Sequence, residues 1–278
     1  MNQQKLDAID SILLETPEYA EILRLFRGIF SYVGNRQGAT GISFTPDMAN
    51  HELRVRSGFP LVTPDNMVVD TAVATAFLEG LLNHVAGESP EGGEALRQIS
   101  NLLADNRFDL PLLLGACLQR DREKITTAAV DNNVQAALLE FVLETMLKTS
   151  LEPLAATLSV DDFSGWQEGS CPVCGSRAGM AELVGDEGHR FLCCCSCFFK
   201  WPFKRLACPY CGNADSETLS YFTVEEGATR VDTCKKCSRY LKTRDSRKGH
   251  AAIPLEVEDL ATIHLDLLAG REGFERGK

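Results

Sequence analysis

Through its first part, the chain repeats apolar residues at intervals of three and four, the spacing of one face of an α-helix. Shorter stripes lie in 94–104 and 110–120, and Thr16-Pro17 supplies the N-cap and first turn of another helix. Apolar stripes of this kind pack into a hydrophobic core far more often than they form a binding surface. We therefore expect residues 1–158 to form an all-α helical domain. The clearest stripe, in 131–149, comprises Val134, Ala137, Leu138, Phe141, Val142, Thr145 and Met146.

The pattern changes after residue 158. Residues 159–170 lack periodicity and contain two glycines, which predicts a linker. Further on, the period becomes two, and this predicts a strand whose aromatic face comprises Phe199, Trp201 and Phe203. Apolar residues return to helical spacing after Pro254, behind an acidic first turn. We expect a C-terminal helix at 254–270 that packs back on the body of the protein.

The segment between these helical regions holds four Cys-x-x-Cys pairs. The first and third read Cys-Pro-x-Cys-Gly, a turn that directs two thiolates toward one point. The gaps between the first and second pairs, and between the third and fourth, each suit a short β-hairpin. The repeated pattern is a strong signal for two tetrahedral metal sites with four cysteine ligands each. The expected ligands are Cys171, Cys174, Cys194, Cys197, Cys208, Cys211, Cys234 and Cys237.

Sequential pairing is the simpler assumption, with the first two pairs in one site and the last two in the other. An interleaved pairing stays open. Structural disulfides are the main competing interpretation, but they belong to oxidising compartments, and the N-terminal residues lack the pattern of an export signal. Tetrahedral thiolate ligation accepts both zinc and iron, so spacing does not choose between a zinc ribbon and a rubredoxin-like iron centre.

The metal is expected to be required for folding. A Cys₄ zinc site can supply about 10–16 kcal/mol of apparent binding free energy, whereas a whole domain is typically stable by about 5–15 kcal/mol. The two modules, 171–206 and 207–250, are each too small for a hydrophobic core of their own. The fold class is therefore expected to be α+β, with a helical N-terminal domain, two small rubredoxin- or zinc-ribbon-like β modules and the C-terminal helix.

Two further cysteines flank a predicted ligand in the run Cys-Cys-Cys-Ser-Cys. Only Cys194 has the three-residue offset from Cys197, so Cys193 and Cys195 fall outside the pattern. Either could be a reactive spare thiol. We favour the interpretation that both are bystanders.

Charge and motifs narrow the function classes. The net charge is −11, yet residues 170–250 carry thirteen Lys/Arg against nine Asp/Glu. The thiolates of two Cys₄ sites cancel that surplus, so the basic module is weak evidence for nucleic-acid binding.

There is no phosphate-binding loop and no evident catalytic triad. Closed metal sites leave no open position for a substrate. No uncharged run exceeds ten residues, which together with the cysteine usage favours the cytoplasm.

The C-terminal hundred residues resemble the formate dehydrogenase accessory protein FdhE family. The resemblance lies in the order of the four pairs, in Cys-Pro-Val-Cys-Gly-Ser from 171 and in Arg190-Phe-Leu. It continues in Trp201 and Arg205 and ends with the Cys234-x-x-Cys-x-x-Tyr-Leu-Lys motif. Cys193 and Cys195 depart from the family pattern.

The resemblance implies a cytoplasmic, non-enzymatic maturation factor. Such proteins bind the catalytic subunit of respiratory formate dehydrogenase, are needed for its activity, and carry iron in rubredoxin-like sites. The contact is expected at the metal module. Two other classes stay open: a zinc-ribbon nucleic-acid-binding protein and an electron-transfer protein that uses its S₄ iron. The candidate contact residues are Trp201, Lys204, Arg205, Tyr240 and Lys242. Packing and charge balance are the alternative role, which we favour for Trp201 and Tyr240.

Overall fold

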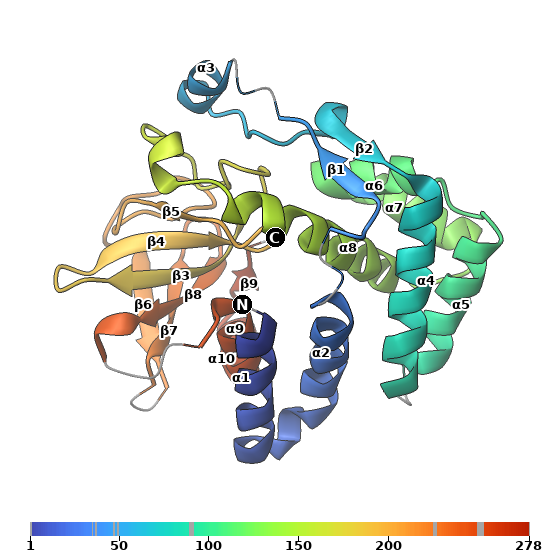
Figure 1. Ribbon diagram of the computed structural model, residues 1–278. Coiled ribbons are helices and arrows are strands. Elements are labelled where there is room, and N and C mark those ends of the chain that lie inside the picture. The colour runs from blue at the N-terminus through green and yellow to red at the C-terminus, as the bar shows by residue number, and fades with distance from the viewer. Residues whose placement is uncertain are drawn as a thin grey trace. The chain divides into compact units, whose positions relative to one another are not determined.

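The structure is a computed structural model whose elements group into two compact units, Met1–Asp47 with Val62–Leu154, and Met48–Leu61 with Ala155–Lys278 (Figure 1). The domain boundaries expected from the sequence stay a prediction. None of the helices described is long and apolar enough to cross a membrane. The residues described are 2–34, 36, 38–46, 48, 50–88, 92–224, 227–248 and 253–277.

The first unit is helical apart from one small sheet, in which β1 (Ile42–Phe44) pairs antiparallel with β2 (Met67–Val69). Its α-helices, with short 3₁₀ turns at Pro17–Tyr19 and Pro64–Asn66, are α1 (Asn2–Glu15), α2 (Ala20–Val33), α4 (Thr71–Glu88), α5 (Gly93–Ala104), α6 (Leu110–Gln119), α7 (Arg122–Asp131) and α8 (Ala136–Ala156).

The apolar stripes of these helices form the core of the first unit. Leu78, Ile99, Leu114 and Met146 come from four different helices, and each is fully buried. Helix α7 is absent from the helices expected from sequence, because it carries little amphipathic pattern. It begins where the side chain of Asp121 accepts a hydrogen bond from the backbone N–H of Lys124, so a cap rather than a stripe marks it.

The second unit is built on one seven-stranded sheet with the order β5-β4-β3-β8-β7-β6, in which β9 (Glu275–Arg276) also pairs with β8. Each Cys₄ module supplies three antiparallel strands. The first supplies β3 (Ala178–Val184), β4 (His189–Cys194) and β5 (Lys200–Pro202). The second supplies β6 (Leu219–Thr223), β7 (Thr229–Cys234) and β8 (Arg239–Asp245). The hairpins expected between the knuckles are present as β3–β4 and β6–β7.

The two modules share this sheet because β3 pairs in parallel with β8, from Met180 opposite Lys242 to Leu183 opposite Asp245. A central strand has neighbours on both edges and can be covered on both faces. Six of the seven residues of β8 are accordingly buried, among them Lys242 and Arg244. Charged residues in a strand usually indicate an exposed face, but Lys242 and Arg244 lie in the interior, where each pairs with carboxylates described below.

Residues 159–170, which lack periodicity, are ordered by aromatic packing within the second unit. A 3₁₀ turn at Val160–Phe163 begins with a capping box between Ser159 and Asp162. Phe163 and Trp166 are buried, and the Phe163 ring meets the Phe199 ring edge-on at 5.1 Å. Helix α3 (His51–Arg56) also belongs to this unit.

The C-terminal helical segment consists of two helices, α9 (Leu255–Ala261) and α10 (Ile263–Arg271), so the expectation of one helix is wrong. The Lys242 ammonium donates to the carbonyl oxygens of Asp259 at 2.7 Å and Thr262 at 3.3 Å, which lie at the break. Both helices pack on the sheet. Leu255 contacts Met180 and Cys193, while Leu265 and Ala269 cluster with Val231 and Tyr240.

Candidate metal centres

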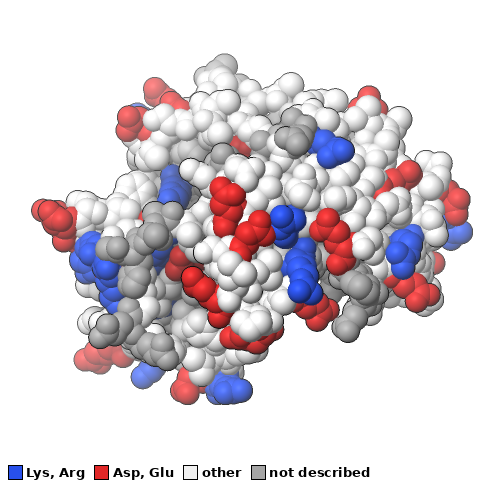
Figure 2. All heavy atoms as spheres, turned by 60° about the horizontal axis from the view of Figure 1, so that its bottom comes forward, with Lys and Arg blue, Asp and Glu red and all other residues white. Residues whose placement is uncertain are grey.

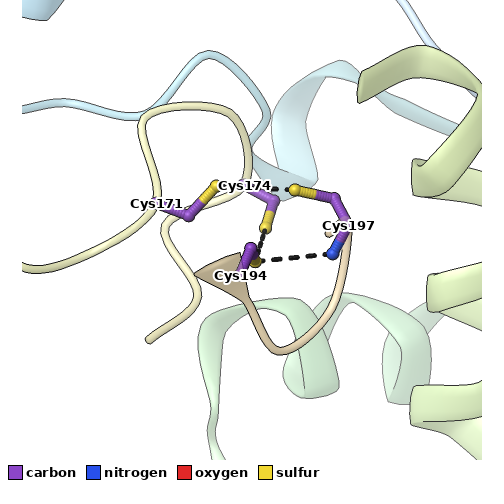
Figure 3. A group of neighbouring side chains, drawn as sticks. All are labelled: Cys171, Cys174, Cys194 and Cys197. Carbon is purple, nitrogen blue, oxygen red and sulfur yellow. Dashed lines mark hydrogen bonds between the residues drawn. The ribbon is translucent and has the colours of Figure 1, made fainter. Parts of the chain in front are cut away.

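The first two Cys-x-x-Cys pairs bring four sulfurs to one point (Figure 3). Cys171 and Cys174 lie in the turn before β3, Cys194 ends β4, and Cys197 lies in the turn that follows. The Sγ atoms of Cys171 and Cys197 are 3.4 Å apart, and those of Cys174 and Cys194 are 3.5 Å apart. We call this group the first cluster.

The last two pairs form a second cluster of the same design. Cys208 and Cys211 precede β6, Cys234 ends β7, and Cys237 lies in the turn before β8. The Sγ separation is 3.7 Å for Cys208 and Cys237 and 3.8 Å for Cys211 and Cys234. The structure therefore groups the cysteines sequentially, not in the interleaved arrangement.

These separations fit a tetrahedral metal ion. A metal–sulfur bond of about 2.3 Å places the sulfurs of a regular tetrahedron about 3.8 Å apart. In each cluster all four sulfurs lie within 4.8 Å of one another. Both clusters can hold a metal ion, and with four protein ligands each site is closed. Which metal they hold, and the ligand role of each cysteine, stay predictions.

The backbone around the two clusters repeats residue for residue. Gly175 and Gly212 follow the first knuckle of each cluster, and both have φ near +70°. A side chain is strained in that conformation, which explains the glycine of Cys-Pro-x-Cys-Gly. After the second knuckle, Phe198 and Ser238 occupy the same left-handed region with φ of 58° and 54°. The two modules are thus copies of one supersecondary unit.

The clusters differ in their access to solvent. All four cysteines of the first cluster are buried, whereas Cys211 is exposed and Cys237 is half-buried in the second. Burial raises the pKa of the Cys197 thiol. Burial acts on Cys234 in the same direction, but the backbone N–H groups of Cys237 and Lys236 outweigh it and lower its pKa to about 7. A bound cation would hold all of these groups as thiolates.

Neither additional cysteine belongs to a cluster. Cys193 precedes Cys194 on β4, so its side chain points to the opposite face of the sheet, where it packs against Met180 and Leu255. Burial raises the pKa of its thiol to about 12, which leaves it unreactive at neutral pH. Cys195 is exposed, with its Sγ 3.8 Å from the hydroxyl of Ser196.

Three of the candidate contact residues are buried, which agrees with the packing role favoured for Trp201 and Tyr240 and contradicts a partner contact by Lys242. Trp201 is fully buried and donates from Nε1 to the carbonyl of Glu168 at 3.2 Å. Tyr240 donates its hydroxyl hydrogen to Asp266, and the Lys242 ammonium lies 2.6 Å from the same carboxylate. Lys204 and Arg205 are exposed. Burial of Trp201 also removes it as a stacking surface for single-stranded nucleic acid.

Buried ion pairs inside the sheet are the feature that sequence inspection misses. Glu182 on β3 accepts from Arg244 on β8 at 2.6 Å, from Lys200 at 2.6 Å and from the Ser246 hydroxyl at 2.6 Å. Burial opposes the charge, but Lys200, Ser246 and Arg244 together lower the pKa of Glu182 to about 2. The sequence around Lys242 and Arg244 gave no signal of burial, because basic residues at every second position are also typical of an exposed strand face.

The surface charge is mixed. On the face shown in Figure 2, the Lys and Arg side chains of the described residues lie among Asp and Glu side chains. A nucleic-acid-binding protein typically presents a continuous basic stripe, and that face has none among the residues drawn in colour.

Comparison with known proteins agrees with this geometry. The family model described as "FdhE, C-terminal domain" matches residues 206–278. The "Protein FdhE homolog" of Aquifex aeolicus is 34% identical over 154 residues, which cover 54% of this chain and 54% of that protein. The C-terminal part of the chain is thus similar to the C-terminal domain of FdhE proteins. The FdhE homolog of Shewanella oneidensis is 27% identical over 205 residues, which cover 72% of this chain and 65% of that protein.

The match extends to the fold of the whole chain. The crystal structure of the FdhE protein from Pseudomonas aeruginosa superposes with a TM-score of 0.70 and covers 99% of this chain and 93% of that one. At 19% identity, this likeness shows a shared fold. The matched sequence spans about half the length of the Aquifex relative.

Proposed function

We propose that this protein is an accessory factor for a respiratory formate dehydrogenase, which it binds through the catalytic subunit and helps to become active. It works in the cytoplasm and turns over no substrate of its own. Similarity to FdhE proteins supports the proposal, together with what the sequence resemblance implies. The names of the relatives from Aquifex aeolicus and Shewanella oneidensis identify them only as FdhE homologs.

The observation that carries the non-catalytic role is the closure of both clusters. Each brings four sulfurs within 4.8 Å of one another, so a tetrahedral ion would have a full set of protein ligands. A hydrolytic metal centre needs one position for water or substrate. The clusters therefore suit folding, electron storage or recognition of a partner better than Lewis-acid catalysis.

We propose iron as the metal in cells, with zinc as the alternative occupant after overexpression. Thiolates in a tetrahedral set suit both ions, and the separations of 3.4–3.8 Å accept either. Iron(III) bound by four thiolates absorbs visible light, and zinc does not. A native, anaerobically purified protein that is colourless and holds two zinc ions per chain would refute the iron assignment.

The test of the accessory role is a deletion strain complemented with plasmid-borne variants. Loss of the gene should abolish respiratory formate dehydrogenase activity while the catalytic subunit is still synthesised, and the wild-type gene should restore it. A tagged wild-type protein should recover that subunit from an anaerobic extract. Cys193→Ser is the matched control for serine variants of the cluster cysteines, because Cys193 lies outside both clusters. Normal activity in the deletion strain would refute the proposal.

A further inference from the structure

A solvent-open pocket lies beside the second cluster, and nothing in the proposed function requires it. Its volume is about 100 Å³, and it lies on strands β6, β7 and β8 and on the segment that leads into the cluster. Cys208 and Cys234 form part of its wall. The space is large enough for one carboxylate or phosphate group and too small for a whole nucleotide.

The pocket is lined by four arginines and one acid. The acid is Asp232, and it already accepts from Arg230 at 2.8 Å, from Arg190 at 3.3 Å and from the Thr243 hydroxyl at 2.8 Å. Among the described residues, the hydrogen bonds of the other two arginines go to neutral groups. Arg205 donates to the carbonyl of Glu187 at 2.8 Å, and Arg239 donates to that of Arg276 at 3.5 Å. The lining thus has an excess of three positive charges.

Arg190 is the most buried of the four arginines. Its side chain is 4% exposed, and its Nη1 donates to the carbonyl of Ala207 at 2.9 Å. Its Nε atom is buried and has no hydrogen-bond partner among the residues that the structure describes. A buried donor without an acceptor is destabilising, and more so when the group is charged. An anionic acceptor in the pocket would offset that cost.

Balance of the thiolate charge does not account for these arginines. A divalent ion in the second cluster would leave a formal charge of −2. The knuckle Cys234-Lys-Lys-Cys237 already supplies two exposed cations, Lys235 and Lys236. Two cations other than the pocket arginines thus lie on the cluster's own knuckle.

The mouth of the pocket is apolar. The side chains of Leu206 and Tyr221 line it and are 68% and 62% exposed. The guanidinium of Arg230 stacks over the Tyr221 ring, 4.4 Å from its centroid, which holds both groups in place. A ligand that fits would combine one anionic group with an apolar portion.

We propose that this pocket binds a carboxylate or phosphate group, held by Arg205, Arg239 and Arg190. Guanidinium groups bind both anions in forked, charge-assisted hydrogen bonds, and apolar contact with Leu206 and Tyr221 adds to them. The anion can be free or attached to a larger ligand. The site is independent of the accessory role, because it is argued from this chain's own side chains.

The test titrates inorganic phosphate, acetate and phenyl phosphate into the metal-loaded full chain at constant ionic strength held with sodium chloride. We expect saturable amide chemical-shift changes at Ser220, Tyr221 and Arg239. Phenyl phosphate should bind more tightly than inorganic phosphate if the apolar mouth contributes. Preference for phosphate over acetate, or the reverse, identifies which anion the ligand carries.

The Arg205→Gln/Arg239→Gln variant should bind phosphate more than tenfold more weakly, since it removes two charged groups that donate charge-assisted hydrogen bonds. Both side chains lie outside the clusters, so metal content should be unchanged. The matched control is Arg56→Gln, which removes an exposed arginine from the same unit and should bind like the wild type. Shifts that do not saturate, or equal weakening by both variants, would overturn the proposal.

Discussion

The buried carboxylate of Glu182 is expected to be one of the main determinants of stability in the second unit. Its side chain is 9% exposed, and that of its partner Arg244 is 8% exposed. The change Glu182→Gln keeps the shape of the side chain and removes its charge. The Arg244 guanidinium then stays buried beside a neutral amide, and removing one partner of a buried ion pair typically costs about 3–5 kcal/mol.

The lowered pKa of Glu182 gives a second value for the free-energy cost of the Glu182→Gln change. The pKa of Glu182 falls from 4.5 to about 2, and one pKa unit corresponds to about 1.4 kcal/mol, which gives about 3 kcal/mol. Part of that comes from Lys200, whose side chain is 43% exposed and therefore screened by solvent. We expect Glu182→Gln to lower the free energy of unfolding by about 2–3 kcal/mol.

The assay is urea unfolding of the metal-loaded protein, followed by tryptophan fluorescence. The chain has two tryptophans, Trp166 and Trp201, and both lie in the second unit, so the signal reports that unit alone. With a urea dependence of about 2 kcal/mol per molar, the midpoint should fall by about 1–1.5 M. The control is Glu187→Gln, in which the side chain removed is 83% exposed, and its midpoint should hardly change.

The pH dependence has a definite sign. The folded-state pKa of Glu182 is lowered, so its contribution is fully present above the unfolded pKa of 4.5 and is lost as the pH falls toward about 2. The difference between wild type and variant should therefore be constant between pH 7.5 and 5.5, with metal content checked at each pH. A cost no larger than that of Glu187→Gln, or a difference that disappears within this range, would refute the argument.

Three other outcomes are expected. Cys171→Ser and Cys208→Ser should each lose one metal ion per chain by elemental analysis, while Cys193→Ser keeps both; loss of metal in Cys193→Ser would contradict the ligand assignment. A chelator should remove metal in two phases, with the cluster that contains exposed Cys211 emptied first; a single phase would contradict the difference in access. Lys242→Met should lower the tryptophan-detected unfolding midpoint, because it removes the buried cation between the carboxylates of Asp259 and Asp266, which then keep only Arg276 as an ionic partner among the described residues; a wild-type midpoint would contradict that role.

The local parts of the site could be predicted because their signals are local. A Cys-Pro-x-Cys-Gly turn needs only five residues, and the left-handed Gly175 and Gly212 confirm why glycine stands there. The hairpins between knuckles follow from the gap lengths. Stripes of apolar residues predicted helices such as α5 and α6 to within a residue or two at each end. In each case, the determining residues lie within one element or one turn.

The parts that could not be predicted depend on contacts between distant residues. The joining of the two modules rests on β3 and β8, whose partners Glu182 and Arg244 are 62 positions apart. A lysine or arginine in a strand indicates an exposed face unless its carboxylate partner is known. The break at Thr262 has no evident signal in the sequence either, and the group that accompanies it, the Lys242 ammonium, comes from a distant strand of the sheet.

The two clusters differ in how far solvent reaches their sulfurs. All four cysteines of the first cluster are buried, although its module also has an edge strand, β5. In the second cluster Cys211 is exposed and Cys237 is half-buried. An exposed thiolate can be reached by a competing ligand or an oxidant, whereas a buried one first requires local unfolding. The first cluster is therefore suited to holding the fold together. The second, together with the arginine-lined pocket beside it, is the part of the molecule where metal chemistry and binding of another molecule can occur at the surface.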